Sequence, residues 1–255
     1  MIVSKVRRLP VLLISAIAII MLLWSVNGIS AAPAKVSGYQ GIPGLVLGEG
    51  SPWARIKNPS KGSTKVIGKA SNGCISGAKA LPKSGKGYVS IRRYRNRYYG
   101  HADTISLIKG LGDRLAKHTN RLIMVGDMAQ PRGGEMASQH RSHQNGLDVD
   151  IWFQLATSQS EAGKADPPTM VAANGLIVNE HWSKYQVFLV KTAAQHPGVD
   201  RIFINPAIKR ELCKTEKGNR GYLRKLRAWR GHDAHFHVRM RCPNGSPNCE
   251  QQPSI

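Results

Sequence analysis

Two short segments of the chain concentrate side chains that can bind metals or move protons. Five of the nine histidines fall in them: His140 and His143 in the first segment, and His232, His235 and His237 in the second. Imidazole groups ligate divalent metal ions and also act as general acids and bases. The two segments are therefore the candidate functional site.

The first segment alternates apolar and acidic residues. Between residues 147 and 151 the apolar side chains alternate with Asp148 and Asp150, which predicts a strand that carries both carboxylates on one face. Gly146 lets the chain turn into this strand. His143 stands on the loop before it, and six intervening residues allow the imidazole to fold back toward Asp150. We expect Asp148 either to orient an imidazole N–H or to remain a solvated side chain.

The second segment alternates in the same way. His235 and His237 share one face of a predicted strand, whereas Phe236 and Val238 share the other. Two such strands can supply an imidazole and a carboxylate from the first and an imidazole from the second. Three protein ligands that leave a fourth position for water are typical of a catalytic zinc site, where the metal lowers the pKa of bound water to about 7 and polarises a carbonyl.

Both strands and helices must position these residues, and loops rich in Gly and Pro join them. Hydrophobic periodicity predicts further strands at 88–92, 121–128 and 201–205, and helices at 104–115, 182–194 and 206–213. The mixture indicates an α+β fold. With about 220 residues left after a leader, the chain is long enough for one sizeable domain.

The N-terminus has the pattern of an export signal. Three basic residues precede an uncharged stretch that is apolar from Val11 to Val26, and Ala32-Pro33-Ala34 follows with the small side chains that signal peptidase requires. We expect cleavage after Ala34, with an uncleaved membrane anchor as the alternative. The expected organisation is a signal peptide at 1–34, a basic extended arm at 35–70 and the folded domain at 71–255.

Four cysteines in an exported chain favour disulfide bonds over free thiols. Cys242 and Cys249 are the expected pair, because the six residues between them form turns readily. Cys74 and Cys213 either form a second bridge or remain free. No C-x2-C spacing occurs, which argues against a zinc site made of cysteines.

The chain is strongly basic, with 37 Lys and Arg against 15 Asp and Glu and a formal net charge of +22. Residues 51–100 contain 12 basic residues and no acidic one. Such a segment attracts polyanions, and tyrosines among its arginines would suit nucleic acid. For an exported protein we favour anionic lipid headgroups and wall polymers. A solvated basic surface without a specific ligand is the other alternative.

The spacing His143-x6-Asp150, followed by His235-x-His237, resembles that of the lysostaphin-type and D-alanyl-D-alanine metallopeptidases. The wider sequence resembles one branch of that group, the penicillin-insensitive murein endopeptidases. The segments that carry this resemblance run in the family's order from Ser71 to Glu250 and comprise Ser71-Asn-Gly-Cys74, Arg97-Tyr-Tyr-Gly-His101, Val125-Gly-Asp-Met128, 142–150, 201–209, 223–227 and 235–242.

The resemblance implies a zinc metallopeptidase domain at 71–255, in which helices and long loops flank a small antiparallel sheet that carries the zinc. The implied activity is hydrolysis of peptidoglycan cross-links, including the D-alanyl to meso-diaminopimelyl bond, without a serine nucleophile and therefore without sensitivity to penicillin. It places zinc ligands on His143, Asp150 and His237, other active-site histidines on His140 and His232, and the catalytic histidine on His235. We therefore expect His140, His143, Asp150 and His237 as the metal set, and His235 with His232 as the catalytic pair.

The chain departs from the family at Asn174-Gly175-Leu176-Ile177, where the family has an Asp-Gly-Lys-His segment with further metal-binding residues. A second metal position is therefore in doubt. The rival functions are a D-alanyl-D-alanine-type carboxypeptidase, a secreted metal-dependent nuclease and a non-catalytic wall-binding module. We expect peptidoglycan as the partner in the periplasm, no nucleic acid, and no membrane anchor after cleavage; the sequence leaves the oligomeric state open.

Overall fold

The computed structural model describes residues 51–136 and 140–253. The predicted signal peptide at 1–34 and residues 35–50 of the predicted arm lie outside these ranges. In the described part of the chain, no helix combines the length and the apolar character needed to cross a membrane.

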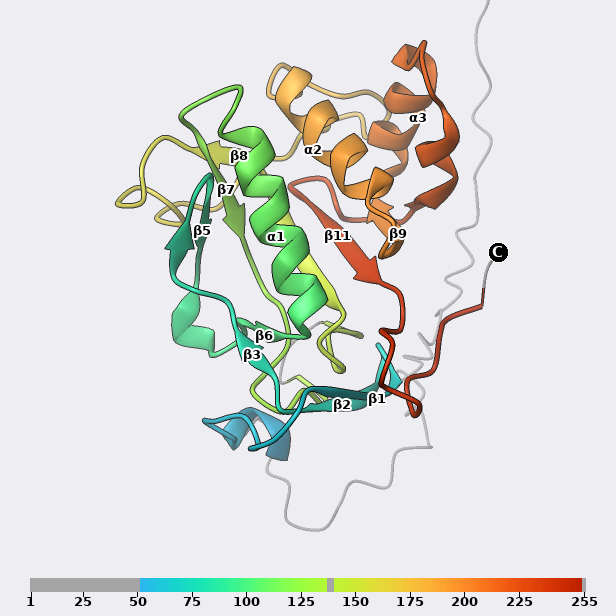
Figure 1. Ribbon diagram of the computed structural model, residues 1–255. Coiled ribbons are helices and arrows are strands. Elements are labelled where there is room, and N and C mark those ends of the chain that lie inside the picture. The colour runs from blue at the N-terminus through green and yellow to red at the C-terminus, as the bar shows by residue number, and fades with distance from the viewer. Residues whose placement is uncertain (1–50, 137–139, 254–255) are drawn as a thin grey trace, which may run out of the picture. The chain divides into compact units, whose positions relative to one another are not determined.

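A mixed seven-stranded sheet forms the centre of the fold (Figure 1). Its strands follow the order β10-β9-β11-β8-β7-β5-β4. Their bounds are Leu226–Ala228, Val199–Ile204, His235–Met240, Asp148–Ala156, Leu122–Val125, Tyr88–Ser90 and Ser84–Gly85, in that order. The pairs β9–β11, β11–β8 and β8–β7 are antiparallel. At the two sides of this group, β10 runs parallel to β9 and β5 runs parallel to β7. The small antiparallel sheet that we expected is thus the middle of a larger, mixed sheet.

Three α-helices accompany the sheet: α1 (Ala102–Leu115), α2 (Lys184–Gln195) and α3 (Pro206–Thr215). In α1, apolar residues recur every three or four positions and are buried. Ser183 begins α2 with a capping box that includes Gln186, and Pro206 opens α3. Figure 1 shows α1 and α2 in front of the sheet. The shorter 3-10 helices are η1 (Pro52–Arg55), η2 (Arg93–Arg95) and η3 (Gly221–Lys225).

A hairpin of β1 (Lys65–Lys69) and β2 (Asn72–Ser76) stands outside the large sheet, as does the pair β3 (Lys79–Ala80) and β6 (Tyr99–Gly100). Val66 of β1 is buried in the main core. The folded part of the chain therefore includes residues 65–70, which we assigned to the arm from the sequence.

The end of the described chain is fastened to this hairpin. The predicted disulfide between Cys242 and Cys249 is present, with Cα atoms 5.7 Å apart. The N–H of Gly68 donates to the carbonyl of Asn248, and the N–H of Glu250 donates to the carbonyl of Gly68. Cys74 and Cys213 are both free thiols and form no second bridge.

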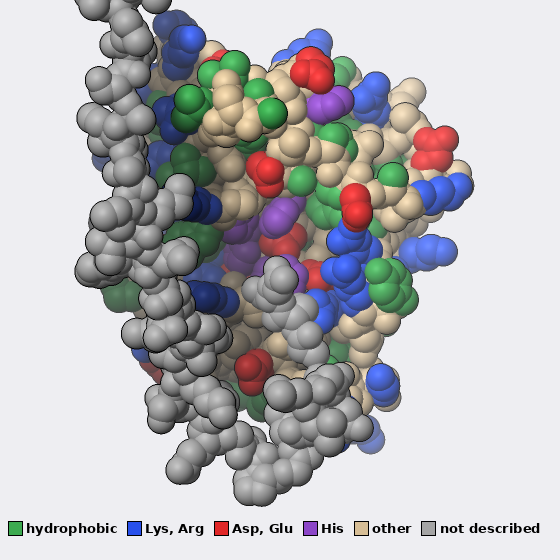
Figure 2. All heavy atoms as spheres, turned by 180° about the vertical axis from the view of Figure 1, so that it is seen from behind, with side chains coloured by type: hydrophobic (Ala, Val, Ile, Leu, Met, Phe, Trp, Pro, Cys, Tyr) green, Lys and Arg blue, Asp and Glu red, His purple; other side chains and the backbone are tan. Residues whose placement is uncertain are grey.

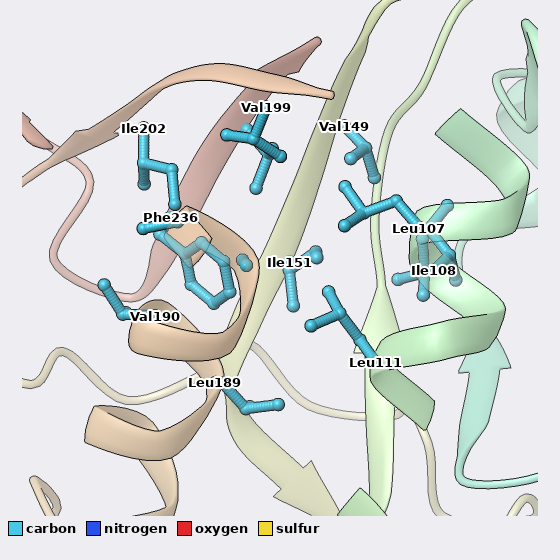
Figure 3. Packing of buried hydrophobic residues seen from close by; sticks show 14 of the residues in the cluster. Leu107, Ile108, Leu111, Val149, Ile151, Leu189, Val190, Val199, Ile202 and Phe236 are labelled. Atoms are coloured by element: carbon cyan, nitrogen blue, oxygen red, sulfur yellow. The ribbon is translucent and has the colours of Figure 1, made fainter. Parts of the chain in front are cut away.

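The hydrophobic core lies between the sheet and the two front helices (Figure 3). Val149 and Ile151 from β8 and Phe236 from β11 point into it, together with Leu107, Ile108 and Leu111 of α1 and Leu189 and Val190 of α2. Each such buried side chain stabilises the fold by about 1.5–3 kcal/mol. Since side chains alternate along a strand, the acidic and imidazole groups of β8 and β11 must project from the opposite face.

Candidate metal centre

The pairing of β8 with β11 places the chemically active side chains opposite one another. His237 faces Asp150, and Arg239 faces Asp148 in the same register. Residues directly opposite in an antiparallel pair project to the same side of the sheet. Figure 2, seen from behind relative to Figure 1, shows histidine side chains gathered in a hollow of this face, with acidic side chains among them. The two predicted strands therefore converge on one site.

His143 reaches the site through a tight turn of the preceding loop. Its φ is 67°, a left-handed conformation that is uncommon for residues other than glycine. The backbone N–H of His143 donates to Asp148 Oδ2 at 3.0 Å, which holds the turn against the strand. Gly146, with a φ of 79°, makes the second turn into β8 as the sequence predicted. As a result the imidazole of His143 is buried over Asp150.

The carboxylate of Asp150 is the point on which the imidazoles converge. Its Oδ1 lies 3.3 Å from His237 Nδ1, 3.4 Å from His143 Nε2 and 3.8 Å from His235 Nε2. Its Oδ2 lies 3.8 Å from His140 Nδ1. The structure therefore brings together all four residues that we expected to bind a metal, with His235 beside them.

The buried polar atoms of this cluster fit a bound cation. Within the described residues, both ring nitrogens of His143 and Oδ1 of Asp150 are buried without a hydrogen-bond partner. Such atoms normally have partners, because an unsatisfied one costs about 1–3 kcal/mol. Ligand atoms around a metal ion lie close together without forming hydrogen bonds to one another, because each points at the ion between them. The donor set of imidazole nitrogen and carboxylate oxygen is one that divalent metals accept.

Ligand atoms of His140, His143 and Asp150 all lie within 4.8 Å of one another, so these three residues form a group able to hold a metal ion. They are the one such group of three or more in residues 51–136 and 140–253. The segment 174–177 contributes to none, and its Leu176 and Ile177 are exposed.

The electrostatics of the cluster follow from burial and from neighbouring charges. Burial raises the pKa of Asp150, but His143 and His235 lower it by more, so the pKa lies well below its usual value. Burial lowers the pKa of His237, while Asp148 and Asp150 raise it by more, to about 9. In the metal-free protein at neutral pH, Asp150 is therefore ionised and His237 carries a proton that a metal ion must displace.

Asp148 is fully buried and is not the solvated side chain that we left open. Arg239 donates to it from Nε and from a terminal nitrogen, each at 2.8 Å, in a bidentate pair. Asp148 Oδ2 also lies 3.2 Å from His237 Nε2. Asp148 is thus placed to orient the ring of His237, whose other nitrogen faces Asp150.

His235 and His232 lie at the margin of the cluster. The side chain of His235 is 30% exposed, against 7% for His237. The ring of His232 lies 5.1 Å from that of His235, measured between centroids. Burial lowers the pKa of His232, and His235 and His237 lower it further, to about 4. His232 is therefore neutral at physiological pH.

A groove of about 410 Å³ opens beside the cluster. Its lining includes His140, His232 and His237 together with the aromatic residues Phe203 and Trp229. The rings of Phe203 and Trp229 meet edge to face, with centroids 5.8 Å apart. We did not identify either aromatic residue from the sequence, because Phe203 is far from both histidine segments and Trp229, three residues before His232, lies outside the alternating run.

The arginines of the basic segment are held by the protein itself. Arg92 and Arg93 lie over the rings of Trp152 and Tyr98. Arg95 and Arg97 bind the buried carboxylate of Asp127 at 3.2 and 3.0 Å. These four arginines thus have intramolecular partners.

Asp127 is a site residue that sequence reasoning missed. It lies in the loop after β7, and its Oδ2 is 3.1 Å from His140 Nε2. Burial raises its pKa, but His140 and Arg97 lower it by more, so the net shift is downward. No periodicity marks a loop residue, and the one available signal was its place in the segment 125–128.

Histidines and carboxylates that converge on one position beside a groove define a centre of the metallohydrolase type. A family model described as penicillin-insensitive murein endopeptidase matches residues 66–255. Proteins named penicillin-insensitive murein endopeptidase from Haemophilus influenzae and Pectobacterium atrosepticum are 43% and 44% identical to this chain over 210 and 206 residues. These matches cover 80% and 79% of this chain and 73% of each relative. A third, from Yersinia enterocolitica, is 44% identical over 206 residues, 79% of this chain and 75% of its own.

The chain therefore belongs to the penicillin-insensitive murein endopeptidase family, and the resemblance inferred from its sequence is confirmed. It is a peptidoglycan endopeptidase, a hydrolase. This excludes the non-catalytic wall-binding module that we weighed as a rival.

Proposed function

We propose that the chain is a zinc-dependent endopeptidase that cleaves the D-alanyl to meso-diaminopimelyl cross-links of peptidoglycan. The observation that carries the proposal is the spacing of two imidazole nitrogens around Asp150 Oδ1, which is itself buried without a hydrogen-bond partner. With bonds of about 2.0–2.1 Å, neighbouring ligand atoms of a tetrahedral zinc site lie about 3.3 Å apart. The separations of Asp150 Oδ1 from His237 Nδ1 and His143 Nε2 are 3.3 and 3.4 Å.

In this proposal His143, Asp150 and His237 hold the zinc, and His140 is a further ligand. A zinc ion in this position supplies a Lewis acid that polarises the scissile carbonyl and activates water. Asp148, fixed by Arg239, lies 3.2 Å from His237 Nε2 and orients the ring so that Nδ1 faces the centre. Asp150 and His237 lie on paired strands, and His143 lies on a turn that a hydrogen bond to Asp148 holds in place, so their geometry is rigid.

His235 is the proposed catalytic histidine. Its Nε2 faces the centre, 3.8 Å from Asp150 Oδ1, while part of the side chain remains exposed. A histidine so placed can accept the proton of the attacking water and return it to the leaving amine, or donate to the tetrahedral oxyanion. The neutral ring of His232 beside it fits a second proton-transfer group. The aromatic wall of the groove offers the apolar part of the substrate peptide a surface.

We further propose that a signal peptide at residues 1–34 exports the protein to the periplasm, and that a basic arm and the peptidase domain follow it in the chain. Peptidoglycan lies outside the cytoplasmic membrane, and the Cys242–Cys249 disulfide suits an oxidising compartment. The proposed partner is peptidoglycan, with no nucleic acid and no membrane anchor after cleavage. N-terminal sequencing of the protein purified from the periplasm tests the cleavage after Ala34.

Digestion of murein sacculi tests the activity. Zinc-loaded protein should convert cross-linked muropeptide dimers to monomers, as seen by mass spectrometry, and benzylpenicillin should not inhibit it. Chelator-treated protein and the Asp150→Asn variant serve as controls and should leave the dimers intact. Release of terminal D-alanine with dimers unchanged would identify a carboxypeptidase instead, and degradation of added DNA would identify a nuclease.

A further inference from the structure

A buried carboxylate lies behind the proposed metal ligands. Asp127 is 5% exposed, and one of its oxygens, Oδ2, receives three donors. Arg95 and Arg97 approach it at 3.2 and 3.0 Å, and His140 Nε2 approaches at 3.1 Å. The two guanidinium groups supply the positive charge that a buried carboxylate needs. The third contact links this ion cluster directly to the metal centre.

The main chain of Asp127 is tied to the strand that carries Asp150. The N–H of Asp150 donates to the carbonyl of Asp127 at 3.0 Å, and the N–H of Gly126 donates to the carbonyl of Asp150 at 2.9 Å. On the other side, the N–H of Met128 donates to the carbonyl of Arg97. One residue therefore contacts two proposed ligands, Asp150 through its backbone and His140 through its side chain.

The contact with Asp127 fixes which nitrogen of His140 carries the proton. An ionised carboxylate only accepts hydrogen bonds, so His140 Nε2 must donate. In a neutral imidazole, Nδ1 then keeps a free lone pair. That nitrogen faces the centre, 3.8 Å from Asp150 Oδ2. In the opposite tautomer Nδ1 would carry the proton and would have no lone pair to offer a metal at the centre.

We propose that Asp127 is a positioning residue of the metal centre, which holds His140 in the Nε2-protonated tautomer so that its Nδ1 can ligate zinc. The inference rests on the proposed zinc-dependent function. A carboxylate behind a metal-bound histidine restricts the ring and raises its basicity, and loss of such a partner typically weakens metal binding by about 10–100-fold.

Zinc affinity of the full chain, measured by competition with a chromophoric chelator, tests the role of Asp127. We expect Asp127→Ala to weaken binding by about 10–100-fold, with a smaller loss in Asp127→Asn, whose amide oxygen can still accept from His140. In the His140→Ala background, Asp127→Ala should cause no further loss, because it acts through that ring. Asp166→Ala removes another ion-paired carboxylate, that of the exposed Arg92 pair, and should leave the affinity unchanged.

The tautomer can be read without any variant of Asp127. In a long-range proton–nitrogen NMR spectrum of the zinc-free wild-type protein, the His140 signals, assigned by their loss in His140→Ala, should show a protonated Nε2 and a bare Nδ1. The opposite tautomer overturns the inference, and so do equal zinc affinities of wild type and Asp127→Ala or additive losses in the double variant. Failure of the wild-type chain to bind zinc overturns the proposed function as well, whereas tight wild-type binding that is unchanged in Asp127→Ala overturns this inference alone.

Discussion

His237 and Asp150 face each other across β11 and β8, with Nδ1 of the imidazole 3.3 Å from Oδ1 of the carboxylate. Both side chains are almost fully buried, and the ladder of two paired strands fixes their separation. A metal centre built on such strands is more rigid than one built on loops. The predictions below test what each residue around this pair contributes.

Replacement of His143, Asp150 or His237 by Ala should abolish zinc binding and sacculus digestion together, because each removes one of the proposed protein ligands. Atomic absorption gives the zinc content, and circular dichroism checks that the fold remains. The variant Lys164→Ala, altered at a residue away from the cluster, serves as a control that should bind a full equivalent. A fully active His143→Ala protein would contradict the ligand assignment.

His235→Ala should keep near-normal zinc content and lose about 10²–10⁴-fold in rate, the usual contribution of a general acid–base group. Metal analysis alongside sacculus digestion separates the two effects. His237→Ala is the matched comparison from the same face of the same strand. If His235→Ala loses zinc as completely as His237→Ala does, then His235 is a ligand and our division of roles is wrong.

Zinc affinity should rise with pH between about 6 and 8, by as much as tenfold per unit. Burial lowers the pKa of His237, yet Asp148 and Asp150 raise it to about 9, so the residue is protonated over this range and zinc must displace its proton. Calorimetry in buffers of different ionisation enthalpy measures the protons released. Binding without proton release at pH 7 would show that His237 does not ligate through the protonated nitrogen.

Asp148→Ala should lower the free energy of unfolding by about 3–5 kcal/mol, because it leaves the mostly buried Arg239 without its bidentate partner. Urea titration of the metal-free protein measures the change. The surface pair of Arg92 and Asp166 gives the comparison, and loss of Asp166 should cost less than about 1 kcal/mol. A loss of similar size in both variants would mean that the buried pair contributes no more than an exposed one.

Much of the local structure was predictable, because the hydrophobic periodicity of a strand or helix depends only on residues that are neighbours in sequence. The alternation around Asp150 and around His237 gave the polar faces of β8 and β11, and Phe236 lies in the core as that alternation requires. The helix expected at 104–115 is observed as α1 at Ala102–Leu115. The turn-forming residues between Cys242 and Cys249 likewise predicted the disulfide.

What the sequence did not contain was the relative placement of segments far apart in the chain. The pairing of His237 with Asp150, the width of the mixed sheet and the approach of Asp127 to His140 all depend on which strands pack together, and local periodicity does not specify strand order. The arginines at 92–97 are the clearest case, for in sequence they form a basic run, whereas in the fold aromatic rings and the carboxylate of Asp127 bind them. Charge is a property of the residue, but whether that charge is free to meet a ligand is decided by its tertiary neighbours.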